Sequence, residues 1–400
     1  MRVLFADALD DVASKQLIDD GWDVMCDPGL RDDALAMRIR ELNPHALVVR
    51  STRIRAEHVA DSTALGLIVR AGAGVNTNDL EACSDRGIFV ANTPGQNALA
   101  VAELTLGLLV ACDRNVVSAA AEVRAGRWRK AHHASGARGL HGRTLAILGM
   151  GAIGEAVAWR ARGFGMNLRA WSRSLDAKRA RLLRVTPCAT PAEAVRGADA
   201  VTVHCAATDD THHLVSASLL AQMPDGCIVL NTSRHELVDE DALLDVVVNR
   251  GFRVGADVLS VEPKGAADVA HPLLSHPGVT VTPHLGASTK QAAEAVALAV
   301  CDVLDQWRHT GRVDSAVNVA RSVGRDGTLI VRHLDRVGVL AGVLDRLRHA
   351  QVNVGEMENI TLNGRRAAIA RIGVSGAVSQ DVLTDLNAME HVIRAAYTVG

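Results

Sequence analysis

Three polar residues in the second half of the sequence have the types that oxidation of a small hydroxy acid requires. They are Arg234 in "NTSRHELVDE", Glu262 in "VLSVEP" and His284 in "TPHLGAST". An imidazole can move a proton, a carboxylate can orient that imidazole, and a guanidinium can bind a substrate carboxylate. Alone the pattern is weak, because His284 beside Pro283 and Glu262 before Pro263 could be ordinary loop residues. A nucleotide-binding turn upstream gives the three residues their weight.

That turn lies in "ILGMGAIGEAVAW", where a predicted strand ends and a helix begins. Gly149 permits the tight turn, Gly151 lets backbone amides approach a pyrophosphate, and Gly154 lets the helix pack closely on the strand. The next strand ends at Ser172 and Arg173, where an acidic residue would bind the ribose hydroxyls of NAD. A neutral serine and an arginine that can pair with a 2′-phosphate favour NADP. In the alternative, Arg173 is simply solvated and NAD binds without the acidic contact.

Strands and helices alternate through most of the chain, which predicts an α/β fold with two doubly wound parallel sheets. The first series runs from "RVLFAD" to "GIFVANTP", and the second has six strands from "TLAILG" to "VTVTPHLG". Between them, the Ala-, Leu- and Val-rich run from Ala98 to about Gly126 predicts one long buried helix. A further helix follows Ser288, and "HTGRVDSAVNVA" has the composition of a polar linker.

Beyond Ser322 the order of elements becomes strand, helix, strand, strand, helix, strand. The apolar residues of the first helix fall on one face, at Val339, Leu340, Val343, Leu344 and Leu347. This order predicts a small ferredoxin-like module with an antiparallel sheet covered on one side. Such a sheet leaves a face or an edge to cover, so we expect dimerisation through the module or a ligand-binding regulatory role.

The composition indicates a globular chain whose ligands are small molecules. Hydrophobic residues make up 48% of its 400 residues, charged residues make up 22%, and 43 Lys and Arg balance 45 Asp and Glu. The length exceeds the roughly 250–300 residues at which one core stops growing, so several domains are expected. Because there is no block of like charge and no long apolar run, we expect neither a nucleic-acid partner nor a membrane partner.

The cysteines and histidines suggest neither disulfides nor metal. The seven scattered cysteines form no CxxC pair, which argues against a disulfide framework and fits a reducing cytoplasm. The amino-terminal residues do not have the pattern of a signal segment. The pairs His132–His133 and His212–His213 lack a third ligand at metal spacing, so we predict no metal site.

Many ordered motifs extend this interpretation to nearly the whole chain. They include "VVRST", "VRAGAGV", "ANTPGQNALAVAELTLGLL", "LGMGAIG", "LVDEDALL", "TPHLGAST" and "VRHLDRVGVL". In these motifs the chain resembles the D-isomer-specific 2-hydroxyacid dehydrogenases, in particular the D-3-phosphoglycerate dehydrogenases that end in an ACT domain. The resemblance implies a flavodoxin-like substrate domain at 1–97 and 286–318, a Rossmann domain at 98–285 and an ACT domain at 322–400.

The resemblance also implies roles for the site residues. His284 would be the general acid/base at C2 while hydride passes to the nicotinamide, Glu262 would hold its ring, and Arg234 would grip the substrate carboxylate. The implied substrate contacts are the backbone of Ala73, Gly74 and Val75, with Arg50 and Arg70 for a second anionic group or, alternatively, for surface ion pairs. The implied nucleotide contacts are Gly149, Gly151, Ala152, Ile153, Gly154, Ser172, Arg173, Cys205, Ala206, Thr211, Ser233, Asp257 and Gly286; Asp257 could instead be a strand-end cap.

Two departures from the family pattern affect the substrate. The loop "GVNTND" and the bulky pair His235 and Glu236 after the arginine replace the usual "GVDNVD" and "RGG". The overall architecture makes 3-phosphoglycerate the first candidate substrate, whereas the altered loops fit the second candidate, a phosphonate or unphosphorylated analogue, better. A rival interpretation is a nucleotide-sensing binding protein, although such a sensor would not need the arginine, glutamate and histidine together.

The tail raises a separate question of regulation. By resemblance, His333, Asp335 and Asn353 would bind serine across a dimer interface. Asp335 stands where an asparagine is often found and would repel the carboxylate of an amino acid, so feedback by serine stays open. We expect a homodimer or a homotetramer.

Overall fold

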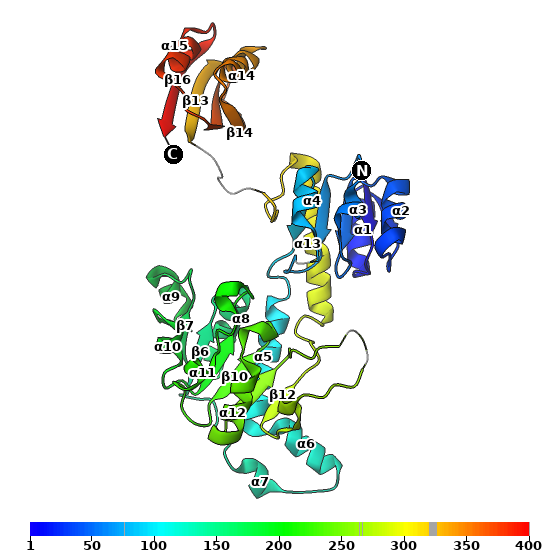
Figure 1. The fold of residues 1–400 in the computed structure, drawn as a ribbon, viewed down its shortest axis with the longest axis vertical. Coiled ribbons are helices and arrows are strands. Elements are labelled where there is room, and N and C mark those ends of the chain that lie inside the picture. Colours follow the sequence, from blue (N-terminus) through cyan, green and yellow to red (C-terminus); the bar gives the residue numbers. More distant parts are fainter. Residues whose placement is uncertain (76, 264, 266, 320–325, 400) are drawn as a thin grey trace. The chain divides into compact units, whose positions relative to one another are not determined.

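The computed structural model describes residues 1–75, 77–263, 265, 267–319 and 326–399 (Figure 1). The chain divides into two compact units, Met1–Asn318 and Val319–Gly400. Asn76 of the "GVNTND" loop and positions 320–325, where the linker was predicted to end and the last domain to begin, lie outside the described residues.

The first sheet of unit 1 has five parallel strands in the order β2-β1-β3-β4-β5. Its central strands are apolar and buried except for the half-buried Arg70 at the end of β4, as expected for a parallel sheet covered on both faces. The strands are β1 (Arg2–Phe5), β2 (Asp23–Cys26), β3 (Ala46–Val49), β4 (Leu67–Arg70) and β5 (Phe89–Asn92). The helices between them are α1 (Asp11–Asp19), α2 (Asp32–Leu42), α3 (Ala56–Val59) and α4 (Leu80–Asp85).

The chain returns to this sheet through α13 (Lys290–Thr310). Ala297, Val300 and Leu304 on α13 are buried in one cluster with Val3 and Phe5 of β1. The residues after α13 pack on β5 as well, with the Val317 N–H donating to the Val90 carbonyl oxygen at 2.8 Å, so the predicted polar linker is held against the sheet at positions 311–318. Asn318 accepts a hydrogen bond from the Val90 N–H at 2.8 Å, a long-range contact that composition could not indicate.

The second sheet has seven parallel strands in the order β12-β11-β10-β9-β6-β7-β8. The six predicted strands are present, and the additional β8 (Thr186–Pro187) is a two-residue edge strand too short to predict. The others are β6 (Thr144–Leu148), β7 (Asn167–Trp171), β9 (Ala200–Val203), β10 (Ile228–Asn231), β11 (Arg253–Ala256) and β12 (Val279–Val281). The strand order reverses at β6, the place where such sheets bind nucleotides.

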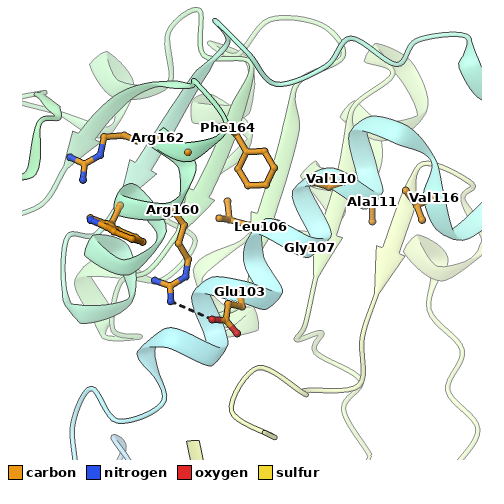
Figure 2. A pocket seen from close by; sticks show the side chains of 11 residues that line it. Glu103, Leu106, Gly107, Val110, Ala111, Val116, Arg160, Arg162 and Phe164 are labelled. Atoms are coloured by element: carbon orange, nitrogen blue, oxygen red, sulfur yellow. Dashed lines mark hydrogen bonds and ion pairs between the residues drawn. The ribbon is translucent and has the colours of Figure 1, made fainter. Parts of the chain in front are cut away.

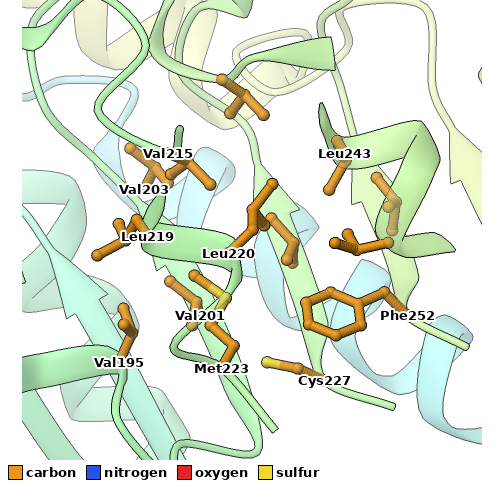
Figure 3. Packing of buried hydrophobic residues seen from close by; sticks show 14 of the residues in the cluster. Val195, Val201, Val203, Val215, Leu219, Leu220, Met223, Cys227, Leu243 and Phe252 are labelled. Carbon is orange, nitrogen blue, oxygen red and sulfur yellow. The ribbon is translucent and has the colours of Figure 1, made fainter. Parts of the chain in front are cut away.

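Helices on both faces bury this second sheet. Figure 3 shows part of the core, where Val201 and Val203 of β9 pack with Leu219, Leu220 and Phe252. The helices are α8 (Ala152–Gly163), α9 (Ala177–Leu183), α10 (Pro191–Val195), α11 (Ala217–Leu220) and α12 (Glu240–Arg250), with 3-10 turns η1 (Asp209–Thr211), η2 (His235–Leu237) and η3 (Pro272–Ser275).

The single helix predicted from Ala98 to about Gly126 is wrong. α5 (Ala98–Arg114) packs on the second sheet and ends at Asn115, whose φ of 52° is left-handed. Then follow α6 (Val116–Arg124) and α7 (Lys130–Ala134), neither of which has a buried residue. In the described part of the chain no single helix is long and apolar enough to cross a membrane; α5 and α6 reach that length and composition only as a pair bent by 67°.

Unit 2 has the predicted βαββαβ order. Its antiparallel sheet has the strand order β14-β15-β13-β16, and the two helices cover one face. The elements are β13 (Gly327–Leu334), α14 (Val339–His349), β14 (Asn353–Thr361), β15 (Ala367–Ser375), α15 (Gln380–Ala388) and β16 (Val392–Val399). The predicted fold class, two parallel-sheet layers followed by a ferredoxin-like module, is confirmed.

Candidate active site

The glycine turn after β6 has the geometry of a dinucleotide site. Gly149 has φ of 102°, and a Cβ there would lie 2.5 Å from the His204 carbonyl oxygen. A Cβ on Gly154 would overlap the Gly149 carbonyl oxygen, whereas one on Gly151 would meet nothing within 4 Å. The close approaches hold the turn against the sheet, and the open space lies where α8 begins with Ala152 and Ile153. Free N–H groups at a helix start bind phosphate, so these residues fit the pyrophosphate of NAD or NADP.

Ser172 and Arg173 follow β7, beside this turn in the sheet. The Arg173 side chain is 67% exposed and its nearest acidic partner is Asp210, with the nitrogen and oxygen 3.4 Å apart. The Ser172 hydroxyl lies 3.5 Å from that of Ser174. An exposed guanidinium in one long, solvated ion pair could exchange that partner for a phosphate at little cost.

The predicted nucleotide contacts after β9 and β10 shape the same edge of the sheet. The Thr211 hydroxyl donates to the Ala206 carbonyl oxygen at 2.7 Å, and the Ser233 hydroxyl donates to that of Val203 at 2.7 Å. Burial raises the pKa of the Cys205 thiol, which donates to the Leu148 carbonyl oxygen. These side chains hold loops in place, because their donors already have partners within the chain.

His204, a buried histidine that the sequence interpretation missed, packs against the glycine turn. His204 Nε2 lies 2.8 Å from the Thr202 hydroxyl, and burial lowers the pKa of His204 to about 3. Its ring is therefore neutral at physiological pH, and its backbone blocks any side chain at Gly149.

His284 and Glu262 form a direct pair after β12 and β11. His284 Nδ1 lies 2.7 Å from Glu262 Oε1 and 2.9 Å from Oε2, which leaves Nε2 as the ring nitrogen for proton transfer. His284 has a left-handed φ of 54°. Its N–H donates to the Asp257 carbonyl oxygen at 3.0 Å, so the surrounding chain holds this uncommon conformation.

Asp257 holds the loop that carries His284. Its side chain is buried and accepts the N–H of Leu285 at 2.8 Å and that of Gly286 at 2.7 Å, together with the Thr282 hydroxyl. A Cβ on Gly286 would lie 3.0 Å from this carboxylate. Of the two interpretations of Asp257, the geometry supports the strand-end cap, and Gly286 acts with it to fix the loop.

Arg234 lies at the start of η2 and lines a cavity of about 310 Å³ together with His284. Its guanidinium donates to the Ser233 carbonyl oxygen at 2.7 Å. Among the described residues, His235 and Glu236 are absent from this cavity's lining; their side chains lie 3.5 Å apart instead. The two bulky residues after the arginine therefore turn away from the space that Arg234 and His284 share.

The first sheet supplies the opposite wall of this cavity. Arg50, Arg70, Ala73 and Gly74 line it, and Val75 does not. Burial, with the neighbouring charges of Arg50 and Arg234, lowers the pKa of the Arg70 guanidinium. Its Nε is buried without a hydrogen-bond partner among the described residues. The guanidinium crosses Gly72, where a Cβ would overlap it. The cavity thus has cationic walls on both sides, which suit an anionic substrate.

The sequence interpretation also missed the carboxylate that holds this wall. Asp7 follows β1 and accepts the N–H groups of Arg50 at 2.7 Å, Ser51 at 2.9 Å and Thr52 at 2.9 Å. Burial alone would raise the pKa of Asp7, but these backbone hydrogen bonds lower it to about 2. Its position directly after the first strand of a parallel sheet was a signal that could have identified it.

The predicted effector residues do not come together within one chain. His333 is buried, and its ring nitrogens lie 2.8 Å from the Leu334 carbonyl oxygen and 3.1 Å from Asn359 Oδ1. Asp335 lies just beyond the end of β13 and donates its N–H to the Arg366 carbonyl oxygen at 3.0 Å. Asn353 begins β14 at the opposite end of the sheet, roughly 25 Å away at about 3.3 Å per residue.

The histidine pairs serve local structure. His133 Nε2 lies 2.9 Å from Glu122, and the rings of His212 and His213 stack with centroids 4.0 Å apart. Across the described positions there is no group of three His, Cys, Asp or Glu that could hold a metal ion.

A wider hollow, about 860 Å³, lies away from these residues, between α5 and α8 (Figure 2). Leu106, Val116 and Phe164 make it largely apolar, and an ion pair between Arg160 and Glu103 at 3.3 Å lies in it. Trp159 of this hollow is 68% exposed.

Comparison with known proteins agrees with the geometry. Residues 106–286 match the family described as D-isomer specific 2-hydroxyacid dehydrogenase, NAD binding domain. A hydroxypyruvate reductase from Thermotoga maritima is 35% identical over 305 residues, which is 74% of this chain and 95% of that protein. A D-3-phosphoglycerate dehydrogenase from Methanocaldococcus jannaschii is 33% identical over 321 residues, 80% of this chain and 60% of that protein.

A solved structure of the TT0316 protein from Thermus thermophilus is also similar. It shares 34% identity, has a TM-score of 0.69, and covers 79% of this chain and 100% of its own. Together with the glycine turn and the paired histidine and glutamate, these matches decide the family. The chain belongs to the D-isomer specific 2-hydroxyacid dehydrogenases, which are NAD-dependent oxidoreductases.

Proposed function

We propose that the chain oxidises a small anionic D-2-hydroxy acid at C2, and reduces the matching 2-oxo acid in the reverse direction. The observation that carries the proposal is the cavity of about 310 Å³ in which His284 and Arg234 face the cationic wall of Arg50 and Arg70. A cofactor held through its pyrophosphate at the glycine turn would supply a nicotinamide as the hydride acceptor for the hydrogen on C2.

The residues of this chain supply binding and proton transfer. Arg234 binds the substrate carboxylate, which places C2 and its hydroxyl beside His284. His284 Nε2 takes the hydroxyl proton as the C–H bond breaks, so that the alcohol loses one hydride and one proton and becomes a carbonyl. Glu262 holds Nδ1 and so fixes the orientation of the ring.

For the substrate, we propose a molecule with a second anionic group, with 3-phosphoglycerate first and a phosphonate or unphosphorylated analogue second. Arg70 supports this choice, because a half-buried guanidinium beside two other cations gains from a bound anion. The hydroxypyruvate reductase name of one relative keeps an unphosphorylated substrate in the comparison.

The deciding experiment measures reduced-cofactor formation or consumption across 2-hydroxy and 2-oxo acids, with and without phosphate or phosphonate, using both cofactors. Turnover of 3-phosphoglycerate or 3-phosphohydroxypyruvate supports a place in serine synthesis, and turnover of another acid assigns a different substrate. Cofactor binding without any turnover, unchanged in His284→Ala, would instead support the nucleotide-sensing alternative.

We further propose a preference for NADP over NAD. The exposed Arg173 beside Ser172 supports it, since this cation can pair with a 2′-phosphate. The test is the ratio of kcat/KM with NADP to kcat/KM with NAD. Arg173→Gln should lower this ratio by roughly tenfold, as expected for one charge-assisted pair. A strong NAD preference in the unchanged protein would contradict the proposal.

Self-association into a homodimer or homotetramer, in a reducing cytoplasm, completes the proposal. The apolar hollow beside Trp159 and the effector residues at opposite ends of the unit 2 sheet both support a second copy as partner. All seven cysteines are free thiols, which is compatible with a reducing compartment. Light scattering gives the oligomeric state, and a serine titration tests whether an amino acid acts as effector.

A further inference from the structure

Glu240, which does not line the substrate cavity, holds the loop that carries Glu262. Glu240 Oε1 accepts the Ser260 N–H at 3.0 Å, and Oε2 accepts the Ser260 hydroxyl at 2.6 Å. His271 Nε2 lies 3.1 Å from the same Oε2. The Glu240 side chain thus accepts hydrogen bonds from the N–H and the hydroxyl of Ser260, two positions before Glu262. It also contacts His271 at the start of η3.

Glu240 is placed for this contact and not for capping its own helix. It is the first residue of α12, and the preceding Asp239 already caps that helix by accepting the Ala242 N–H at 3.1 Å. The side chains of Glu240 and His271 are each 14% exposed, so water competes weakly between these two, whereas Ser260 is itself exposed. His271 Nδ1 accepts the Leu273 N–H, which leaves the proton on Nε2 to be donated to Glu240.

The two members of the proton-transfer pair therefore stand on loops that are held in the same manner. Asp257 fixes the loop of His284 through two backbone N–H groups and a hydroxyl. Glu240 fixes the loop of Glu262 through one backbone N–H, a hydroxyl and an imidazole.

We propose that Glu240 is a positioning residue that sets the distance between Glu262 and His284, an inference that rests on the proposed dehydrogenase function. The pair depends on contacts of 2.7 and 2.9 Å, and a displacement of about 1 Å can cost on the order of 10²-fold in rate. Loss of Glu240 would let the 258–262 segment move while the glycine turn stays in place.

The test is a double-mutant cycle on the full chain. We expect Glu240→Gln to lower kcat/KM by roughly 10- to 100-fold, mostly through kcat, because outer partners that orient functional side chains have effects of this size. In a Glu262→Gln background the same change should cost less than about threefold, because the group it positions is gone. Cofactor affinity, measured by fluorescence of the reduced nicotinamide, should stay within about twofold.

Glu193→Gln is the matched control. Glu193 also accepts a loop N–H, from Ala189 at 2.7 Å, beside the edge strand β8, roughly 24 Å or five strand spacings from β11. It should keep full activity. If Glu240→Gln does not fold, Ser260→Ala removes one hydroxyl of the same cluster and should give a smaller loss with the same dependence on Glu262.

The outcomes separate this inference from the proposed function. Unchanged activity of Glu240→Gln, or an equal fold loss with and without Glu262, overturns the positioning role while the dehydrogenase stands. Absence of turnover in the unchanged protein overturns the proposed function, and hydrogen exchange then decides the positioning role. Faster exchange at 258–262 in Glu240→Gln than in Glu193→Gln supports that role, and equal exchange refutes it.

Discussion

The two walls of the substrate cavity are organised in opposite ways. The wall from the seven-stranded sheet has His284, which is paired with Glu262 outside the cavity lining, and both stand on loops fixed by buried or partly buried carboxylates. The wall from the five-stranded sheet has unmatched cations, with Arg70 Nε buried and without a hydrogen-bond partner among the described residues. Asp7 fixes the backbone of that wall at Arg50 but not the two guanidinium groups.

The two walls therefore have different roles in the reaction. A preorganised histidine and glutamate need no ligand to reach their working geometry, which suits proton transfer. Clustered arginines are destabilising until an anion arrives, so they contribute most to binding and selectivity. Variants of His284 on one wall and of Arg70 on the other should therefore separate kcat from KM.

The largest effect is expected at His284. His284→Asn should lower kcat by roughly 10³-fold, because general acid/base catalysis contributes about 10²–10⁴-fold, while cofactor affinity stays unchanged. Steady-state kinetics and fluorescence titration measure the two quantities. His276→Asn is the control, since His276 precedes β12 and its ring accepts the Gly278 N–H at 3.1 Å. If a His284 variant keeps most of its kcat, proton transfer does not take place at this wall.

The next largest effect is expected at Arg70. Arg70→Met should raise KM for a phosphorylated substrate by roughly 10²-fold and change kcat little, because one buried charge-assisted contact is worth about 1.5–3 kcal/mol. It should also raise the melting temperature slightly, since a cation beside Arg50 and Arg234 is removed. Arg40→Met, which breaks an exposed ion pair with Asp61, is the control. An equal KM change for substrates without a second anion would contradict this role.

A smaller effect is expected at Asp257, which holds the loop of His284 in the wall from the seven-stranded sheet. Asp257→Asn keeps the size of the side chain but loses a carboxylate oxygen that accepts the Gly286 N–H. We expect kcat to fall about 30-fold by displacement of His284, with KM unchanged. Asp176→Asn, which makes the same change of charge at the cap of α9, should leave kcat unchanged. If cofactor affinity falls in place of kcat, Asp257 is a nucleotide contact as the family resemblance implied.

Much of this arrangement could be predicted because the relevant signals are local in sequence. The glycine turn, the alternation of strands and helices, and the positions of Arg234, Glu262 and His284 after successive strands need only short windows of sequence. The strand order then brings those strand ends together, because carboxyl ends of parallel strands meet at one edge.

The missed features depend on contacts between distant residues. Asn115 ends α5 in a left-handed conformation, although its apolar surroundings favoured one continuous helix. Asn318 holds the supposed linker against β5 across more than 200 positions. Glu240 looks like a surface acid in the sequence, and for Glu240 as for Asp7 only the fold shows which N–H groups donate to the carboxylate.

The smallest effect in this series concerns the backbone under the arginine wall. The pKa of Asp7, lowered from 3.8 to about 2, means that the ionised carboxylate stabilises the folded state by about 2 kcal/mol at neutral pH. A lowered folded pKa gives stability that is present above the unfolded pKa and is lost as pH falls through the folded value. Asp7→Asn should therefore lose about 2 kcal/mol of unfolding free energy at pH 7.

The pH dependence distinguishes this effect from a simple packing change. The difference between Asp7→Asn and the unchanged protein should shrink as pH falls from about 5 toward 2, because the native carboxylate then becomes protonated. Urea unfolding across that range measures it, with Asp79→Asn, the cap of α4, as control. A difference that stays constant with pH would mean that the charge of Asp7 is not what holds Arg50, Ser51 and Thr52. The backbone of the wall from the five-stranded sheet would then be ordered by packing alone. The two walls would differ only in their side chains.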